Sequence, residues 1–165
     1  MNKILNGVLI IAILGAIGAL FYTVAKPNSE RFTEFYILGI NGNATDYPTD
    51  FTLRNGQVIS VQYGNGTVPI NQSYGQVQLS IVNHEQQQTT YSVTMQIDSV
   101  QVDIPYNDLN FKILGPINLA PGEKWQQEIG IEPQHTGENE KVELFLYKDG
   151  TNTPYLSLNL LINVE

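Results

Sequence analysis

The sequence predicts an all-β domain, an immunoglobulin-like antiparallel sandwich of about eight strands, preceded by one N-terminal transmembrane helix. Apolar and polar residues alternate with period two in several segments, as in strands that bury one face. Turn residues separate these segments at regular spacing, with no helical pattern between them. Residues 4–25 form an uncharged apolar run of about 22 residues, close to the ~20 that span a bilayer.

The apolar run is expected to be a retained anchor that lies in membrane lipid through residues 4–25. A cleaved secretory signal is the alternative, because Lys3 gives a basic start and residues 23–25 (TVA) resemble a cleavage site. The run exceeds the about 7–15 apolar residues of a signal, and Phe21 and Tyr22 suit the membrane interface. We therefore favour the anchor.

The chain is accordingly divided into an anchor (residues 1–25), a linker (26–31) and a sandwich (32–165). Lys3 and the free amino group favour an N-terminus inside the cell, although Lys26 and Arg31 beyond the anchor act against this orientation. The expected location is the cell membrane, as a single-pass protein with its main domain outside the cell.

Small residues recur along the predicted anchor at spacings of three and four. Gly15 and Ala19 form a small-xxx-small pair, a spacing that lets two membrane helices approach closely. The simpler interpretation is that glycine and alanine are common in membrane helices, and it is preferred.

The first half of the outer domain begins with a strand. Residues 32–40 (FTEFYILGI) are rich in aromatic and branched residues, whereas residues 41–50 (NGNATDYPTD) read as a loop. Residues 57–63 are a short strand. Residues 64–75 are rich in turn residues, and Pro69 excludes a central strand there.

Clean alternation follows in two neighbouring segments. Val77, Leu79 and Ile81 face one way, and residues 91–97 repeat the pattern after the polar connection 83–88. At Asp98 and Ser99 the alternation changes phase: the apolar residues before this point are odd-numbered, and those after it are even-numbered. This change implies a bulge or a tight turn.

The last part of the chain predicts four more strands, at residues 111–119, 125–131, 140–148 and 155–165. The final one is the clearest, because its leucines, Ile162 and Val164 all share one face.

Composition excludes several function classes. The formal net charge of −8 repels phosphate backbones, so no nucleic acid partner is expected, and it argues against a basic lipid-binding patch. The chain has no cysteine, which excludes disulfides, thiolate metal sites and a cysteine nucleophile. It has no Gly-x-Ser-x-Gly, phosphate-binding or dinucleotide motif. Neither an enzyme nor a cofactor is expected.

Three triplets match the N-glycosylation acceptor pattern, at Asn43, Asn65 and Asn71. About two such triplets are expected by chance in a chain of this composition. All three fall in turn-rich segments of the outward domain, so they stay candidate modification sites.

The histidines and aspartates give no metal signature. His84, next to Glu85, and His135 are the only histidines, and a zinc site needs three or four ligands. Two aspartate groups do not match the calcium-loop pattern, so turn chemistry is preferred for them: Asp46 and Asp50, and Asp98, Asp103 and Asp108.

Aromatic residues raise the alternative of a sugar-binding face. Tyr91 and Trp125 fall on the apolar side of their strands and are expected in the core. Five other tyrosines are candidates for exposure: Tyr36, Tyr63, Tyr74, Tyr106 and Tyr147.

Six phrases resemble the domain of unknown function 1616 family, membrane proteins of archaea and some bacteria. They are FTEFYILG (32–39), DYP (46–48), IVNHE (81–85), GEKW (122–125), GENEKVELFLYK (137–148) and PYLSLNLLINV (154–164). The resemblance implies a membrane-linked, outward-facing β domain. It implies no activity and no residue roles.

The sequence thus favours a non-catalytic interaction or assembly module, either an accessory subunit of a membrane or cell-envelope complex or a self-assembling surface protein. A surface carbohydrate-binding domain is the alternative. A membrane-tethered hydrolase would require a cleft where carboxylates or histidines converge.

Overall fold

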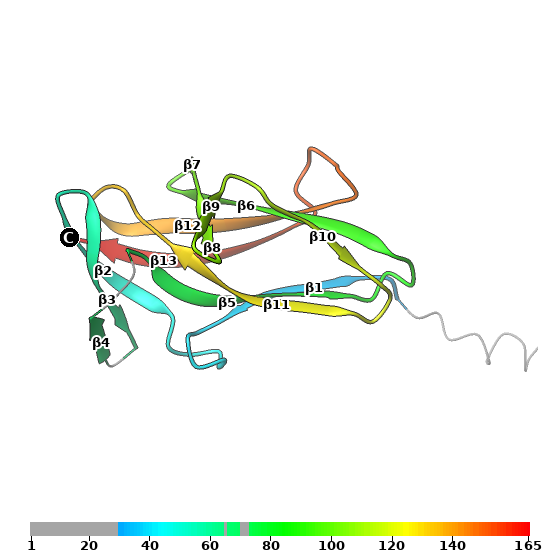
Figure 1. The fold of residues 1–165 in the computed structure, drawn as a ribbon, viewed down its shortest axis with the longest axis horizontal. Coiled ribbons are helices and arrows are strands. Elements are labelled where there is room, and N and C mark those ends of the chain that lie inside the picture. The colour runs from blue at the N-terminus through cyan, green and yellow to red at the C-terminus, as the bar shows by residue number, and fades with distance from the viewer. Residues whose placement is uncertain (1–29, 65, 70–72) are drawn as a thin grey trace, which may run out of the picture. The chain divides into compact units, whose positions relative to one another are not determined.

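The computed structural model describes residues 30–64, 66–69 and 73–165, and residues Arg31–Glu165 form one compact unit (Figure 1). Every regular element in these ranges is a strand. No helix long and apolar enough to span a membrane occurs among the described residues. The predicted anchor, residues 4–25, lies outside them, as do Gly15 and Ala19.

Thirteen strands follow one another along the described chain. They are β1 (Thr33–Leu38), β2 (Pro48–Arg54), β3 (Gln57–Tyr63), β4 (Gly66–Pro69), β5 (Gly75–Asn83), β6 (Thr89–Ile97), β7 (Val100–Val102), β8 (Ile104–Tyr106), β9 (Leu109–Phe111), β10 (Leu114–Leu119), β11 (Lys124–Ile131), β12 (Gly137–Lys148) and β13 (Leu156–Val164).

The strands form three sheets. A three-stranded sheet has the order β1-β5-β11, and an eight-stranded sheet has the order β10-β6-β12-β13-β2-β3-β4, with β7 paired to β6. Strands β8 and β9 form a separate hairpin. Neighbouring strands are antiparallel throughout, except that β13 runs parallel to β2 at Asn163 and Val164.

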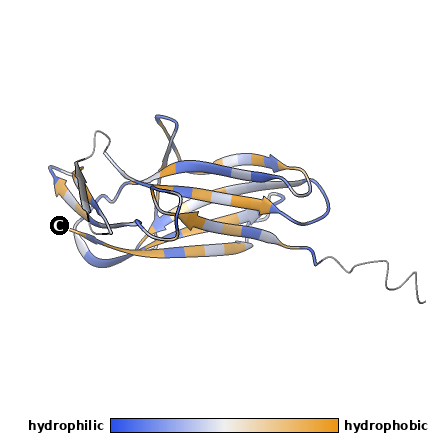
Figure 2. Ribbon diagram, turned by 90° about the horizontal axis from the view of Figure 1, so that it is seen from below, coloured by the Kyte–Doolittle hydropathy of each residue, from blue (hydrophilic) through white to orange (hydrophobic). Residues whose placement is uncertain are grey.

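The two larger sheets share one hydrophobic core. Val77, Leu79 and Ile81 of β5 are fully buried, as are Tyr91 and Met95 of β6 in the other sheet. Figure 2 shows apolar and polar residues following one another along the strands, the pattern of sheets with one buried face. The all-β prediction is therefore confirmed, including the burial of Tyr91.

The predicted change of phase in the apolar alternation is a tight turn. Asp98 and Ser99 join β6 to β7 with φ angles of 47° and 67°, a left-handed conformation that matches the twist of a two-residue hairpin. Met95 and Val102 are partners across this hairpin, so the apolar face changes from odd to even positions as expected.

The prediction of a loop over residues 41–50 was wrong at its end. Strand β2 begins at Pro48 and continues to Arg54, pairing with β3 and burying Phe51 completely. Proline is tolerated at the first position of a strand, where no ladder N–H is needed. In the turn-rich segment that follows, the four-residue strand β4 lies at a sheet edge and ends at Pro69.

The predicted strand over residues 111–119 is two strands. Strand β9 ends at Phe111 and pairs with β8, whereas β10 begins at Leu114 and pairs with β6. The β10 register shifts between Leu114 and Ile117, where Gly115 has a φ of 146°. The described chain has thirteen strands rather than about eight because of this splitting and because β2 and β4 lie in segments where no strand was predicted.

Candidate functional site

A buried carboxylate lies at the end of the sheets where β1 begins. Glu85, in the β5–β6 connection, is 5 % exposed. One of its oxygens, Oε1, accepts hydrogen bonds from Thr33 Oγ1 at 3.0 Å and from Tyr155 OH at 2.9 Å. The other, Oε2, lies 2.8 Å from Lys148 Nζ, which also sits 4.8 Å from the centre of the Tyr155 ring. Glu85 thereby joins β1, β12 and the start of β13.

A second buried polar residue extends this network. The Asn83 side chain donates to the carbonyls of Gln87 and Leu119, both at 2.8 Å, and accepts from the Glu85 N–H at 2.8 Å. The hydroxyls of Tyr91 and Thr33 lie 2.7 Å apart. We call Thr33, Asn83, Glu85, Tyr91, Lys148 and Tyr155 the Glu85 network.

The Glu85 carboxylate and the Lys148 ammonium group each stabilise the charged form of the other. Burial alone would raise the pKa of the Glu85 carboxyl, but hydrogen bonds from Lys148, Tyr155 and Thr33 together outweigh it, and the pKa is lowered. Burial acts to lower the pKa of Lys148, yet the Glu85 carboxylate raises it above its usual range. Both groups therefore stay charged near neutral pH, as a buried pair requires.

Five of the six phrases behind the family resemblance meet at this network. Thr33 comes from FTEFYILG, Glu85 from IVNHE, Lys148 from GENEKVELFLYK and Tyr155 from PYLSLNLLINV. The phrase GEKW joins through Glu123, whose carbonyl accepts from the Asn83 N–H at 3.0 Å. Sequence reasoning noticed each phrase but did not predict that they would converge.

An acidic pocket of about 510 Å³ lies at the other end of β6 and β12. Its lining includes Asp98, Asp103, Glu132, His135 and Glu140, which come from the β6–β7 turn, the β7–β8 connection, the β11–β12 connection and β12. Glu140 is 8 % exposed, and no side chain among the described residues donates a hydrogen bond to its carboxylate. Sequence reasoning missed Glu132 and Glu140, because no motif marks them.

Burial, with a smaller effect of neighbouring carboxylates, raises the pKa of two glutamates in the acidic pocket. Burial, and then the charge of Asp103, raises the pKa of Glu132. Burial, and then Asp98, raises the pKa of Glu140, while His135 opposes this effect. The pocket therefore favours protonated carboxyls or a cationic group beside them. No group of three or more His, Asp or Glu in the described part of the chain is arranged to hold a metal ion.

A glutamine-rich face covers the outer side of the three-stranded sheet. Tyr36, Ser80 and Gln126 lie in register across β1, β5 and β11, and Gln126 Nε2 donates to Gln78 Oε1 at 2.6 Å. The Ser80 hydroxyl is buried and has no hydrogen-bond partner. A shallow hollow of about 350 Å³ beside them is lined by Gln78, Gln126 and Glu128, among others.

The sequence-predicted site residues also include three asparagines and His84, which lies beside the Glu85 network. Asn43 is exposed in the β1–β2 connection, whereas Asn65 and Asn71 are outside the described residues. His84 stacks on Phe32 at 4.5 Å between ring centres, and its Nε2 lies 3.0 Å from Glu34.

The aspartates singled out in the sequence are spread over the fold. Asp46 accepts a hydrogen bond from Asn41 in the β1–β2 connection, and Asp50 accepts one from Asn163 beside β13. Asp108 lies in the β8–β9 turn with a φ of 60°. Of the group Asp98, Asp103 and Asp108, only Asp98 and Asp103 line the acidic pocket.

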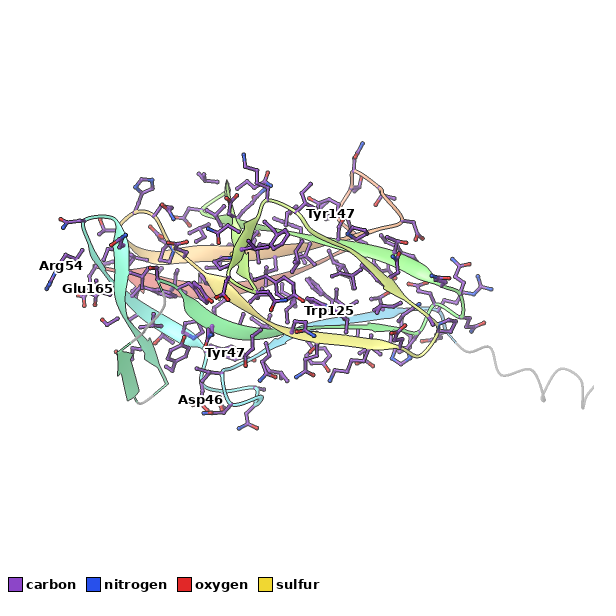
Figure 3. The ribbon with its side chains drawn as sticks, viewed as in Figure 1. Asp46, Tyr47, Arg54, Trp125, Tyr147 and Glu165 are labelled. Atoms are coloured by element: carbon purple, nitrogen blue, oxygen red, sulfur yellow. The ribbon has the colours of Figure 1, made fainter. Side chains whose placement is uncertain are left out.

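The candidate tyrosines are buried or half-buried. Tyr63 is 5 % exposed, and its hydroxyl accepts from the Gln76 N–H at 2.6 Å. Tyr36, Tyr74, Tyr106 and Tyr147 are half-buried. Trp125 (Figure 3), expected in the core, is also half-buried and packs against the core. The centre of its ring system lies 6.2 Å from that of Tyr106.

Comparison with known proteins identifies a family. The model of the family described as Domain of unknown function (DUF1616) matches residues 67–163, more than half of the chain. A search of curated proteins finds no match. The matched residues include Glu85, Lys148 and Tyr155 of the network, but Thr33 precedes them. The chain belongs to the family Domain of unknown function (DUF1616).

Proposed function

We propose that the chain is a membrane-anchored, extracytoplasmic immunoglobulin-like sandwich that works as a non-catalytic interaction or assembly module. It serves either as an accessory subunit of a membrane or cell-envelope complex or as a self-assembling surface protein. The apolar run at residues 4–25 supplies the anchor, and the domain lies outside the cell.

The strand order supports the immunoglobulin-like assignment. The order β1-β5-β11 beside β10-β6-β12-β13 places the first, second and fifth strands of a sandwich in one sheet and the remaining four in the other. This count omits the additional strands β2 to β4 and β7 to β9. Greek-key connections of this kind are typical of immunoglobulin-like and fibronectin type III sandwiches.

The Glu85 network supports attachment through the N-terminal side. Thr33 is the first residue of β1, and its hydroxyl bonds both Glu85 and Tyr91. Any force on the linker enters the domain through β1, so a network that is centred on the buried Glu85 carboxylate and joins β1 to β12 and β13 resists its detachment. Glu85 serves this structural purpose with both carboxylate oxygens engaged.

Exposed apolar side chains around the β8–β9 hairpin are the observation that most directly favours a role in protein interaction over a catalytic role. Val100, Leu109 and Ile113 are 65 %, 62 % and 56 % exposed, and they come from adjacent segments around the β8–β9 hairpin. Gln101 donates to the Lys112 carbonyl at 3.0 Å, which places β7 beside the residue before Ile113. Exposed apolar side chains on neighbouring segments are the material from which protein interaction surfaces are built.

Site-specific cross-linking tests the proposal. The chain has no cysteine, so a single cysteine at Ile113 can carry a thiol-linked photo-crosslinker in native membranes. The expected result is a covalent product of higher mass, with little product from the matched variant Glu138→Cys on the exposed start of β12. A strictly monomeric detergent-extracted chain that gives no cross-linked product from either position would overturn the proposal.

A carbohydrate-binding surface is the second candidate, and the glutamine-rich face favours it. Planar amide side chains beside Tyr36 can donate to and accept from sugar hydroxyls. Calorimetric titration with chitohexaose and cellohexaose checks this candidate. Binding that Tyr36→Ala abolishes supports it, and no heat with either sugar rejects it for these two glycan types.

A further inference from the structure

The last strand of the described fold has a free edge. Strand β13 pairs with β12 along its length, but it pairs with β2 only at Asn163 and Val164. Residues 156–162 therefore have a hydrogen-bonded strand neighbour on one side only, within the part of the chain that the structure describes, and β1 of the three-stranded sheet also lies near β13. Their second row of backbone N–H and C=O groups is available to another strand.

The core-facing side chains at this edge are incompletely covered. Leu156, Leu158 and Leu160 point to the core side of β13, yet all three are only half-buried. Their register partners on β12 are at most 2 % exposed: Leu146, Leu144 and Val142. A further strand beside β13 would cover this row of leucines and remove apolar surface from water.

The free edge also lacks the features with which proteins usually prevent strand addition. Charged residues, proline, bulges and short length are the common protections. Residues 155–164 contain no charge and no proline. The other edge strands of the two larger sheets are protected: β1 has Glu34, β11 has Lys124 and Glu128, β4 ends at Pro69, β10 has Pro116 and a register shift, and β7 is only three residues long.

A second copy of this chain fits the edge. The net charge of −8 makes copies repel over most of their surfaces, whereas this edge is neutral. The midpoint of residues 156–162 is Asn159, so a two-fold axis there opposes Asn159 to itself. Ser157 of one copy then faces Leu161 of the other, and no like charges meet.

We propose that the free edge of β13 is a self-association surface, at which two copies of the chain pair as antiparallel strands centred on Asn159. This inference rests on the proposed function and specifies its partner as a second copy. The pairing extends the eight-stranded sheet of one molecule into that of the other.

Disulfide trapping in the full chain, extracted in detergent, tests the register. Directly opposed residues of antiparallel strands have Cα atoms about 4.5–5.5 Å apart, within the range that a disulfide spans. Asn159→Cys should form a covalent dimer, and a mixture of Ser157→Cys and Leu161→Cys should form the mixed dimer. The matched control Asn163→Cys, beside β2, should stay monomeric. Equal dimer yields from Asn159→Cys and Asn163→Cys would overturn the inference.

A charge at the centre tests the energetics without entering the core. Asn159 is exposed, so Asn159→Lys should leave the melting temperature unchanged while opposing two ammonium groups across the axis. We expect the dimer Kd, measured by sedimentation velocity, to rise at least about tenfold. Asn152→Lys adds the same charge in the exposed β12–β13 loop and should leave the Kd unchanged. An unchanged Kd for Asn159→Lys would overturn the inference.

The two proposals fail in different ways. If the chain forms no β13-dependent dimer but cross-links to a protein through Ile113→Cys, only the self-association surface is rejected. If the full chain is monomeric and gives no product from Ile113→Cys or Asn159→Cys, both proposals are rejected.

Discussion

The phenol of Tyr155 donates a hydrogen bond of 2.9 Å to the carboxylate of Glu85, across 70 residues of chain. Glu85 follows β5 of the three-stranded sheet, and Tyr155 precedes β13 of the eight-stranded sheet. This contact therefore links the two sheets at the end where β1 begins, and the stability of that end depends on it.

Removing the charge of Glu85 should destabilise the domain strongly. Glu85→Gln leaves Lys148 beside a neutral amide, and breaking a buried pair costs about 3 kcal/mol. Tyr155→Phe removes one hydrogen bond and should cost about 1 kcal/mol. Urea unfolding measures both changes. The control Glu34→Gln, whose side chain is 45 % exposed, should change the free energy of unfolding by less than about 0.5 kcal/mol. Equal effects of Glu34→Gln and Glu85→Gln would contradict the assigned role of the network.

The Glu85 network should make the domain sensitive to acid. The pKa of Glu85 is lower in the folded state than in the unfolded chain. Its contribution is therefore present above the unfolded pKa and is lost as the pH falls through the folded pKa. The free energy of unfolding, followed from pH 6 downward, should decrease more steeply for the wild type than for Glu85→Gln. Parallel curves for the two proteins would exclude Glu85 as the source of acid sensitivity.

The acidic pocket should act in the opposite direction. The pKa of Glu140 is raised in the folded state, mainly by burial. Its stabilising contribution is present below the unfolded pKa and is lost as the pH rises through the folded pKa. Glu140→Gln should therefore stabilise the domain at pH 7 by about 1 kcal/mol, because no described side chain donates a hydrogen bond to this buried carboxylate. Glu138→Gln, on the exposed start of β12, is the control and should have little effect. A destabilised Glu140→Gln protein would mean that the carboxylate has a structural partner.

The outer face of β11 should not tolerate a side chain at Gly130. An added Cβ would lie 2.6 Å from both the Tyr74 ring and Pro105 Cβ. Gly130→Ala should therefore cost about 1–3 kcal/mol through overpacking. The matched variant Gly66→Ala has no heavy atom within 4 Å of the added Cβ and should be nearly neutral. Thermal unfolding of the two variants measures the difference, and similar melting temperatures would show that Tyr74 moves away without cost.

The sequence predicted those elements in which local pattern and tertiary packing agree. In β13 the alternating leucines, Ile162 and Val164 show the strand without reference to any partner. In β2 the two disagree: Pro48 and Asp50 are turn residues, but pairing with β3 and burial of Phe51 make the segment a strand. The hairpin β8–β9 was missed because strands of three residues are too short to show a period.

The candidate sites could not be predicted for a different reason. The three side chains that bond Glu85 lie far from it in the chain. Even the nearest in sequence, Thr33, is 52 residues away. No spacing rule relates such residues. The carboxylates of the acidic pocket likewise come from segments that only the fold brings together. Resemblance to the family marked the right phrases for the Glu85 network without indicating their geometry.

Labelling of intact cells tests the central claim, a domain held at the outer face of the membrane. The chain has no cysteine, and Asn152 lies exposed in the β12–β13 loop. An Asn152→Cys chain should sediment with the membranes and react with a membrane-impermeant maleimide in intact cells. Protein that is labelled only after lysis, or that is found in the medium without residues 1–25, would contradict the account.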